Sequence, residues 1–158
     1  MDNTLPPQNL ARPRGLLPWL LVGVVTALLV ATVYFITRPE PYTPEVFGRP
    51  SGVVSQEFFD YGDVNGGTWI ETEFTIKNVG DQPLNILTEP YVELIEGCCP
   101  PIASITARTL YPGQEATVSM SFMMDSGMTG PHEYLAHIMT DDPVEPDKQV
   151  TIVSNWLE

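Results

Sequence analysis

The stretch IETEFTIK, residues 70–77, decides the fold class of this chain. Apolar or small side chains alternate there with charged or polar ones, which is the pattern of a β-strand with one buried face. The stretch ATVSMSF, residues 116–122, repeats the alternation directly after a turn at residues 111–114. Together they predict two strands of a sheet that covers a hydrophobic core.

Five further short segments have the same character and are separated by turns rich in Gly, Asn, Asp and Pro. They cover residues 56–61, 84–87, 102–107, 133–140 and 149–155. Short strands at this spacing favour an all-β fold, an immunoglobulin-like β-sandwich of about seven strands. We therefore place this domain at residues 53–158.

Ahead of the domain, Leu16–Ile36 contains no charged residue. At about 1.5 Å per residue a helix of this length reaches about 30 Å, the thickness of the hydrocarbon core of a bilayer. A cleaved signal peptide is the main alternative, but its apolar region normally has about 7–15 residues followed by small residues. This run is longer and ends in YFITR. The segment therefore predicts a single-pass transmembrane helix at residues 16–36.

The flanks of this helix predict its orientation. Arg12 and Arg14 precede it and only Asp2 opposes them, so the positive-inside rule places the tail at residues 1–15 in the cytoplasm. Residues 37–52 are rich in proline and lack an apolar period, which predicts an extended spacer. We expect a protein of the cell membrane with an extracytoplasmic C-terminal domain.

The charge distribution is strongly uneven. The 158 residues hold 7 Lys and Arg against 20 Asp and Glu, a net charge of −13. Four of these cations and 19 of these acids follow residue 38, so that part of the chain carries a net charge of −15. Nucleic acid is excluded as a partner because its binding needs clustered Lys and Arg. An acidic surface attracts basic proteins instead, such as a basic soluble electron carrier.

Four motifs follow one another along the domain: FDYGDV at residues 59–64, FTIKNVG at 74–80, PG at 112–113 and TDDP at 140–143. Their order and spacing resemble a bacterial immunoglobulin-like domain family of unknown function related to ASH and MSP domains. The resemblance covers about residues 53–155. It implies an exported or membrane-anchored interaction module without shared catalytic residues. The family commonly carries Cys-Gly-Cys between its third and fourth strands, where this chain has GCCPP at residues 97–101.

Cys98 and Cys99 are the sharpest chemical feature of the sequence. Outside the cytoplasm, adjacent cysteines form a strained vicinal disulfide, remain as two thiols, or provide thiolate ligands to a soft metal. The sequence leaves these three states open. An oxidoreductase is not expected, because no C-x-x-C motif is present.

Further candidates for soft-metal ligands are His132, His137, Met123, Met124, Met128 and Met139. Successive side chains of a strand point to opposite faces, so His137 and Met139 share one face while Ile138 points to the core. With Cys98 and Cys99 they predict a Cu(I) site. Zinc is a weaker prediction, because directly adjacent cysteines seldom supply tetrahedral ligands.

The sequence has no glycine-rich phosphate loop and no G-x-S-x-G motif. We therefore expect no enzyme and name no catalytic residue. The favoured interpretation is an interaction module, an accessory or assembly subunit of a larger membrane complex such as an electron-transfer complex. The alternative is a membrane-tethered copper carrier or metallochaperone. Under the favoured interpretation no cofactor is expected, and under the alternative the cofactor is copper.

Overall fold

A computed structural model describes residues 17–37, 41–125 and 127–158 of the chain. The chain divides into two compact units, Met1–Pro41 and Tyr42–Glu158, each of which is described by itself. The predicted cytoplasmic tail at residues 1–15 lies outside the described residues.

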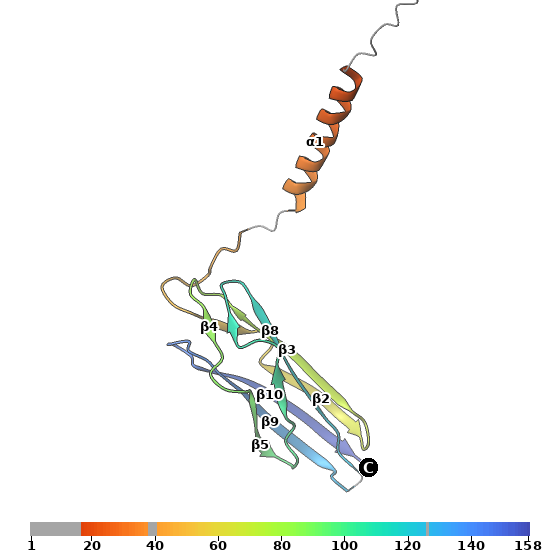
Figure 1. Ribbon diagram of the computed structural model, residues 1–158. Helices are drawn as coiled ribbons and strands as arrows, with labels where there is room; N and C mark the ends of the chain where they lie inside the picture. The colour runs from red at the N-terminus through yellow and green to blue at the C-terminus, as the bar shows by residue number, and fades with distance from the viewer. Residues whose placement is uncertain (1–16, 38–40, 126) are drawn as a thin grey trace, which may run out of the picture. The chain divides into compact units, whose positions relative to one another are not determined.

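The first unit contains a single described helix, α1 (Leu17–Thr37), shown in Figure 1. Its threonine hydroxyls form hydrogen bonds within the helix. Those of Thr32 and Thr37 each donate a hydrogen bond to the backbone carbonyl four residues earlier at 2.8 Å. In the part of the chain that the structure describes, no helix meets the length and apolarity needed to cross a membrane.

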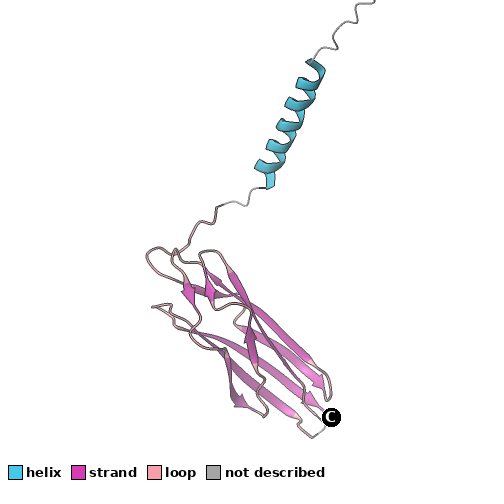
Figure 2. Ribbon diagram, viewed as in Figure 1, coloured by secondary structure: helices cyan, strands magenta, loops and turns pink. Residues whose placement is uncertain are grey.

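The second unit is a β-sandwich (Figures 1 and 2). One sheet has the order β1 (Gly52–Val54), β3 (Ile70–Asn78), β8 (Glu115–Phe122) and β6 (Ala103–Ile105). The other has the order β2 (Phe58–Asn65), β10 (Asp147–Leu157), β9 (Gly130–Met139) and β5 (Tyr91–Glu96). A short pair joins β4 (Leu84–Asn85) to β7 (Thr109–Leu110). Most ladders are antiparallel, but β2 runs parallel to β10.

The core lies between the two four-stranded sheets. Phe74 and Phe122 of the first sheet are buried, and Phe122 makes edge-to-face contacts with Tyr134 and Trp156 of the second. β3 and β8 both alternate between buried and accessible side chains, which confirms the pattern that decided the fold class. The all-β sandwich predicted from the sequence is therefore confirmed, with ten described strands in place of about seven.

Three of the ten described strands have no counterpart in the sequence prediction: β1, β5 and β7. β1 and β7 are only three and two residues long. β5 has six residues, YVELIE, of which five are exposed, so its sequence lacks the alternation of buried and exposed positions. Its existence depends on pairing with β9, which no local pattern reveals.

The N-terminal boundary of the domain also differs from the sequence prediction. Residues 37–52 were expected to form a spacer, but the folded unit begins at Tyr42. A Cβ added at Gly113 would meet the Tyr42 ring at 2.5 Å, so the ring lies directly on this glycine. Val46 forms a parallel bridge with Gly80, and the Gly48 amide donates to Asp81. Residues 42–52 therefore belong to the domain, and residues 38–40 lie outside the described part of the chain.

Candidate functional site

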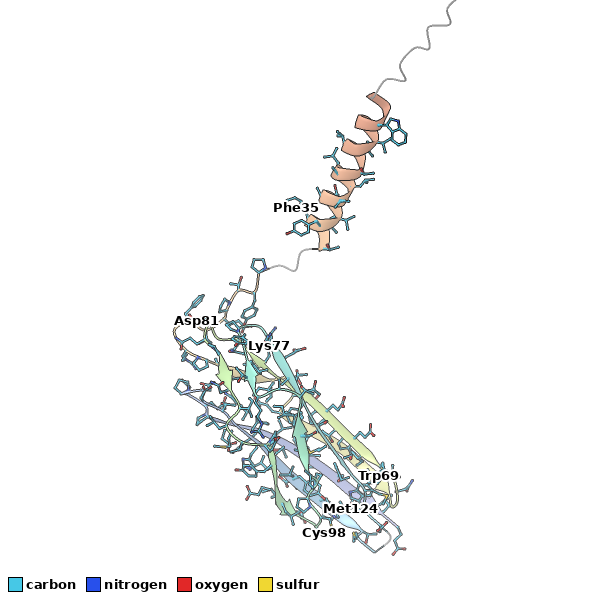
Figure 3. All side chains as sticks on the ribbon, in the orientation of Figure 1. Phe35, Trp69, Lys77, Asp81, Cys98 and Met124 are labelled. Atoms are coloured by element: carbon cyan, nitrogen blue, oxygen red, sulfur yellow. The ribbon has the colours of Figure 1, made fainter. Side chains whose placement is uncertain are left out.

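The two cysteines lie on a turn that follows β5. Cys98 lies toward the end of the sandwich that holds the C-terminus (Figures 1 and 3). Gly97 and Cys99 both have positive φ angles, of 92° and 54°, so the chain reverses tightly around Cys98. A Cβ at Gly97 would lie 2.4 Å from the ring of His132. Glycine is therefore needed at this position, both for its backbone conformation and for the close approach to the histidine.

The side chain of Cys98 contacts the ring of His132. Its Nε2 lies 3.7 Å from the Cys98 sulfur, and its Nδ1 lies 3.1 Å from the carbonyl oxygen of Gly130. A carbonyl only accepts hydrogen bonds, so Nδ1 is the donor in this contact and Nε2 is the ring nitrogen that faces the sulfur. The Tyr134 hydroxyl donates to the Cys98 carbonyl at 2.7 Å and fixes the turn against β9.

Both cysteines are free thiols in the structure, so the disulfide candidate Cys98–Cys99 is not formed. A hydrogen bond with Cys99, followed by burial and the charge of Cys99, raises the pKa of the Cys98 thiol above its ordinary value. The pKa of Tyr134 is raised as well, first by burial and then by the charges of the two cysteines.

His137 lies in a different environment from the cysteines. Its Nδ1 is 2.9 Å from a carboxylate oxygen of Asp147, and its Nε2 is 3.2 Å from Glu93. The ring stacks on Tyr91 with the centroids 4.6 Å apart. Ile138 is buried on the opposite face, as the strand pattern predicts. Both nitrogens of His137 are therefore occupied by carboxylates.

The four residues of the predicted Cu(I) site, Cys98, Cys99, His137 and Met139, are not brought together. His132, which contacts Cys98, is five positions before His137 on β9, a separation of about 16 Å along a strand. Met124, another candidate, is buried in the core. Among residues 17–37, 41–125 and 127–158, no group of three or more His, Cys, Asp or Glu side chains is arranged to hold a metal ion.

A second polar cluster joins the N-terminal segment to the β9–β10 turn. The carboxylate of Asp142 is buried and accepts hydrogen bonds from Arg49 at 2.9 Å and from the amides of Gly52 and Val144 at 3.1 and 3.0 Å. The ammonium of Lys148, also buried, lies 3.1 Å from the same carboxylate. Sequence analysis missed this cluster, because Asp142 and Arg49 are 93 positions apart.

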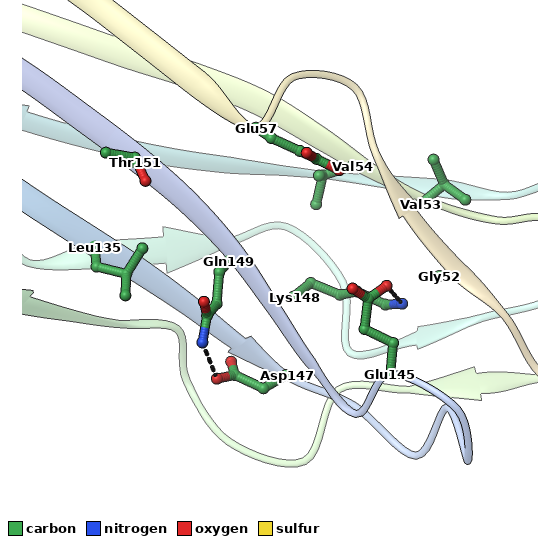
Figure 4. Close-up of a pocket in the computed structure, with 10 residues that line it drawn as sticks. All are labelled: Gly52, Val53, Val54, Glu57, Leu135, Glu145, Asp147, Lys148, Gln149 and Thr151. Atoms are coloured by element: carbon green, nitrogen blue, oxygen red, sulfur yellow. Dashed lines mark hydrogen bonds and ion pairs between the residues drawn. The ribbon is translucent and has the colours of Figure 1, made fainter.

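A pocket of about 400 Å³ lies beside this cluster (Figure 4). Glu57, Glu145 and Asp147 line it, together with Lys148 as its single cation. The Lys148 ammonium is already 2.6 Å from Glu145 and is also paired with Asp142. The pocket therefore has more acidic than basic side chains in its lining. Its one basic side chain, Lys148, forms ion pairs within the protein and stabilises the fold.

β5 is an open edge of the second sheet. It pairs with β9 on one side, and no strand of the described residues pairs with its other side. Tyr91 and Ile95 are each 50% exposed, and Leu94 is 40% exposed. The next exposed large hydrophobic side chain along the chain is Ile102, beyond the cysteine turn. Exposed apolar side chains along an unpaired edge are characteristic of a surface that binds another chain.

No protein-family model and no curated protein matches this sequence. Among solved structures, a protein of unknown function from Porphyromonas gingivalis W83 is similar over 72% of this chain and 49% of that chain, with a TM-score of 0.53 and 15% identity. The ASH/PapD-like domain of human CEP192 is matched over 77% of this chain and 93% of that one, with a TM-score of 0.47 and 14% identity. The periplasmic chaperone SfaE is matched over 68% and 58%, with a TM-score of 0.48 and 11% identity. This chain spans about half the length of the Porphyromonas protein (49%), and the likeness to it concerns the fold alone.

Proposed function

We propose that this protein is a membrane-anchored, extracytoplasmic interaction module that serves as an accessory or assembly subunit of a larger membrane complex and does no catalysis itself. The anchor is the uncharged segment Leu16–Ile36, and this part of the proposal rests on the sequence. The binding part is the domain at residues 42–158.

The observation that carries the proposal is the open edge at β5. The opposite edge of the same sheet, β2, is interrupted by Asp60, Gly62 and Asp63, and Gly62 has a positive φ angle. Charged side chains and irregular backbone on an edge strand discourage pairing with another chain. β5 also carries Glu93 and Glu96 and has a register irregularity between Leu94 and Glu96, but its Tyr91–Leu94 stretch keeps continuous register with β9 and it adds exposed apolar side chains. A partner segment can extend the sheet there by backbone hydrogen bonds.

The chemistry of β5 indicates the kind of segment that it takes. Glu93 is exposed between the apolar positions of β5 and Glu96 is exposed at its end, and the part of the chain after residue 38 carries a net charge of −15. An extended segment that alternates apolar and basic side chains would satisfy both features, and its approach would be faster at low salt. We assign this segment to another subunit of the complex.

Gentle detergent extraction of native membranes tests the proposal. With an affinity tag after Glu158, we expect one or more integral membrane proteins to co-purify in stoichiometric amount, identified by mass spectrometry. High salt during the wash should reduce the recovery, because part of the attraction is electrostatic. Recovery of the chain alone, or its release from membranes without detergent, would contradict the proposal.

A further inference from the structure

We propose that the pocket beside β10 binds an extended peptide segment of another protein that carries a lysine or arginine side chain. The pocket has a volume of about 400 Å³ and is lined by β1 and by the first part of β10 (Figure 4). Pockets that hold small ligands have volumes of about 300–1,000 Å³. In the order of the sheet β9 separates β10 from β5, so this site is distinct from the edge at β5 and independent of the proposed function.

The first part of β10 lacks a neighbouring strand on one side. β9 pairs with β10 from Asp147 onward, whereas β2 pairs with it only from Thr151 onward. The Thr151 amide donates to the carbonyl of Glu57 at 2.8 Å, so the backbone groups of Thr151 point away from β9. Backbone groups of a strand in an antiparallel pair alternate in direction, so those of Gln149 point away from β9 as well.

Gln149 therefore presents a backbone N–H and C=O to the side on which the pocket lies. Gln149 lines the pocket, and in residues 41–125 and 127–158 no strand pairs with it on this side. These two groups can form hydrogen bonds with an added extended segment, as those of Thr151 do with β2.

The gap beside Gln149 is a consequence of the chain path. β1 belongs to the first sheet and β2 to the second, so the connection between them crosses from one sheet to the other. Ser55 at the start of this connection is held on the first sheet, because its amide donates to the Thr75 carbonyl at 2.9 Å and its hydroxyl accepts from the Thr75 amide at 3.0 Å. The connection reaches β10 only at Glu57, beyond Gln149. The gap is therefore formed before any ligand binds.

The charges around the gap select a basic occupant. Glu57, Glu145 and Asp147 line the pocket. The ammonium of Lys148 lies 2.6 Å from Glu145 and 3.1 Å from Asp142, so its charge is neutralised within the protein. Glu57 is exposed, and no ion pair of the described residues involves it. A lysine or arginine side chain would pair with these carboxylates, whereas an acidic segment would be repelled.

The test is an NMR titration of the isotope-labelled, full-length protein in detergent with the peptide acetyl-Thr-Val-Arg-Val-Thr-amide. We expect saturable binding, with the amide resonance of Gln149 among those that shift. Replacing the arginine of the peptide by glutamate should lower the affinity about 10-fold or more, because the carboxylates of the pocket repel it.

A pair of protein variants separates the site from the general acidity of the domain. Glu57→Lys should lower the affinity for the arginine peptide about 10-fold or more. Glu73→Lys is the matched control, because it makes the same change in charge at an exposed position of β3, and it should change the affinity about 2-fold or less.

Two methylated peptides test the backbone pairing and need no protein variant. Methylation of both valine amides removes N–H groups from one side of the extended peptide, and methylation of the arginine amide removes one from the other side. One of the two methylated peptides should lose affinity about 5-fold or more, and the other should bind as the unmodified peptide does. Equal affinities of all three peptides, absence of saturable binding, or equal affinities of Glu57→Lys and Glu73→Lys would overturn the proposal.

Discussion

Replacing Asp142 by alanine is expected to lower the free energy of unfolding by about 3–5 kcal/mol, because it leaves a buried cation without its partner. Lys148 is almost fully buried beside this carboxylate, and Arg49 is the second cation bound to it. The amides of Gly52 and Val144 lose their acceptor at the same time. Urea unfolding of the full-length protein, followed by circular dichroism, measures the change. The exposed carboxylate of Glu115 provides the control, since Glu115→Gln should change stability by about 0.5 kcal/mol or less.

The same carboxylate makes the domain sensitive to acid. Burial by itself raises the pKa of Asp142, but hydrogen bonds from Val144, Lys148 and Gly52 outweigh burial and hold the pKa below its ordinary value of 3.8. A lowered folded-state pKa means that this stabilisation is complete above pH 3.8 and is lost as the pH falls through the folded-state pKa. Asp142→Asn should therefore have a lower free energy of unfolding than the unmodified protein at pH 7. Its free energy of unfolding should then fall less than that of the unmodified protein as the pH is lowered. Parallel pH profiles of the two proteins would contradict this account of Asp142.

Truncation of Trp156 to alanine is expected to cost about 3–5 kcal/mol, the range for a large aromatic side chain removed from a core. Trp156 is 1% exposed, contacts the ring of Phe122 and donates from its indole nitrogen to the buried Ser154 hydroxyl at 2.9 Å. Trp69 is 65% exposed, so Trp69→Ala is the matched control and should change stability by about 0.5 kcal/mol or less. Equal losses for the two tryptophans, measured by urea unfolding, would show that the core is not where the structure places it.

The strands that the sequence predicts well are those with one face in the core. In β3 and β8 the alternation of residues follows directly from burial of every second side chain. β5 is different, because most of its side chains are exposed and its strand conformation depends on hydrogen bonds to β9. Residues 42–52 escaped prediction for a related reason, since Tyr42 and Arg49 dock through contacts with Gly113 and Asp142 that are distant in sequence.

The surroundings of the cysteine turn were only partly predictable from the sequence. The residue types Cys, His and Met indicated soft-metal chemistry, and the face of His137 was assigned correctly. The choice between His132 and His137 required the register of β5 on β9, which places the turn after β5 next to the beginning of β9. That register could be derived only once β5 was recognised as a strand.

The central claim, that β5 is the surface through which the domain joins its complex, is tested most directly by two matched lysine substitutions. Ile95 on β5 and Val53 on β1 are both 50% exposed and both lie on edge strands of their sheets. A lysine on the pairing edge disfavours addition of a further strand. Co-purification from native membranes should therefore lose the partner in Ile95→Lys and retain it in Val53→Lys. Retention of the partner at full stoichiometry in Ile95→Lys, with the variant folded as judged by circular dichroism, would contradict the claim.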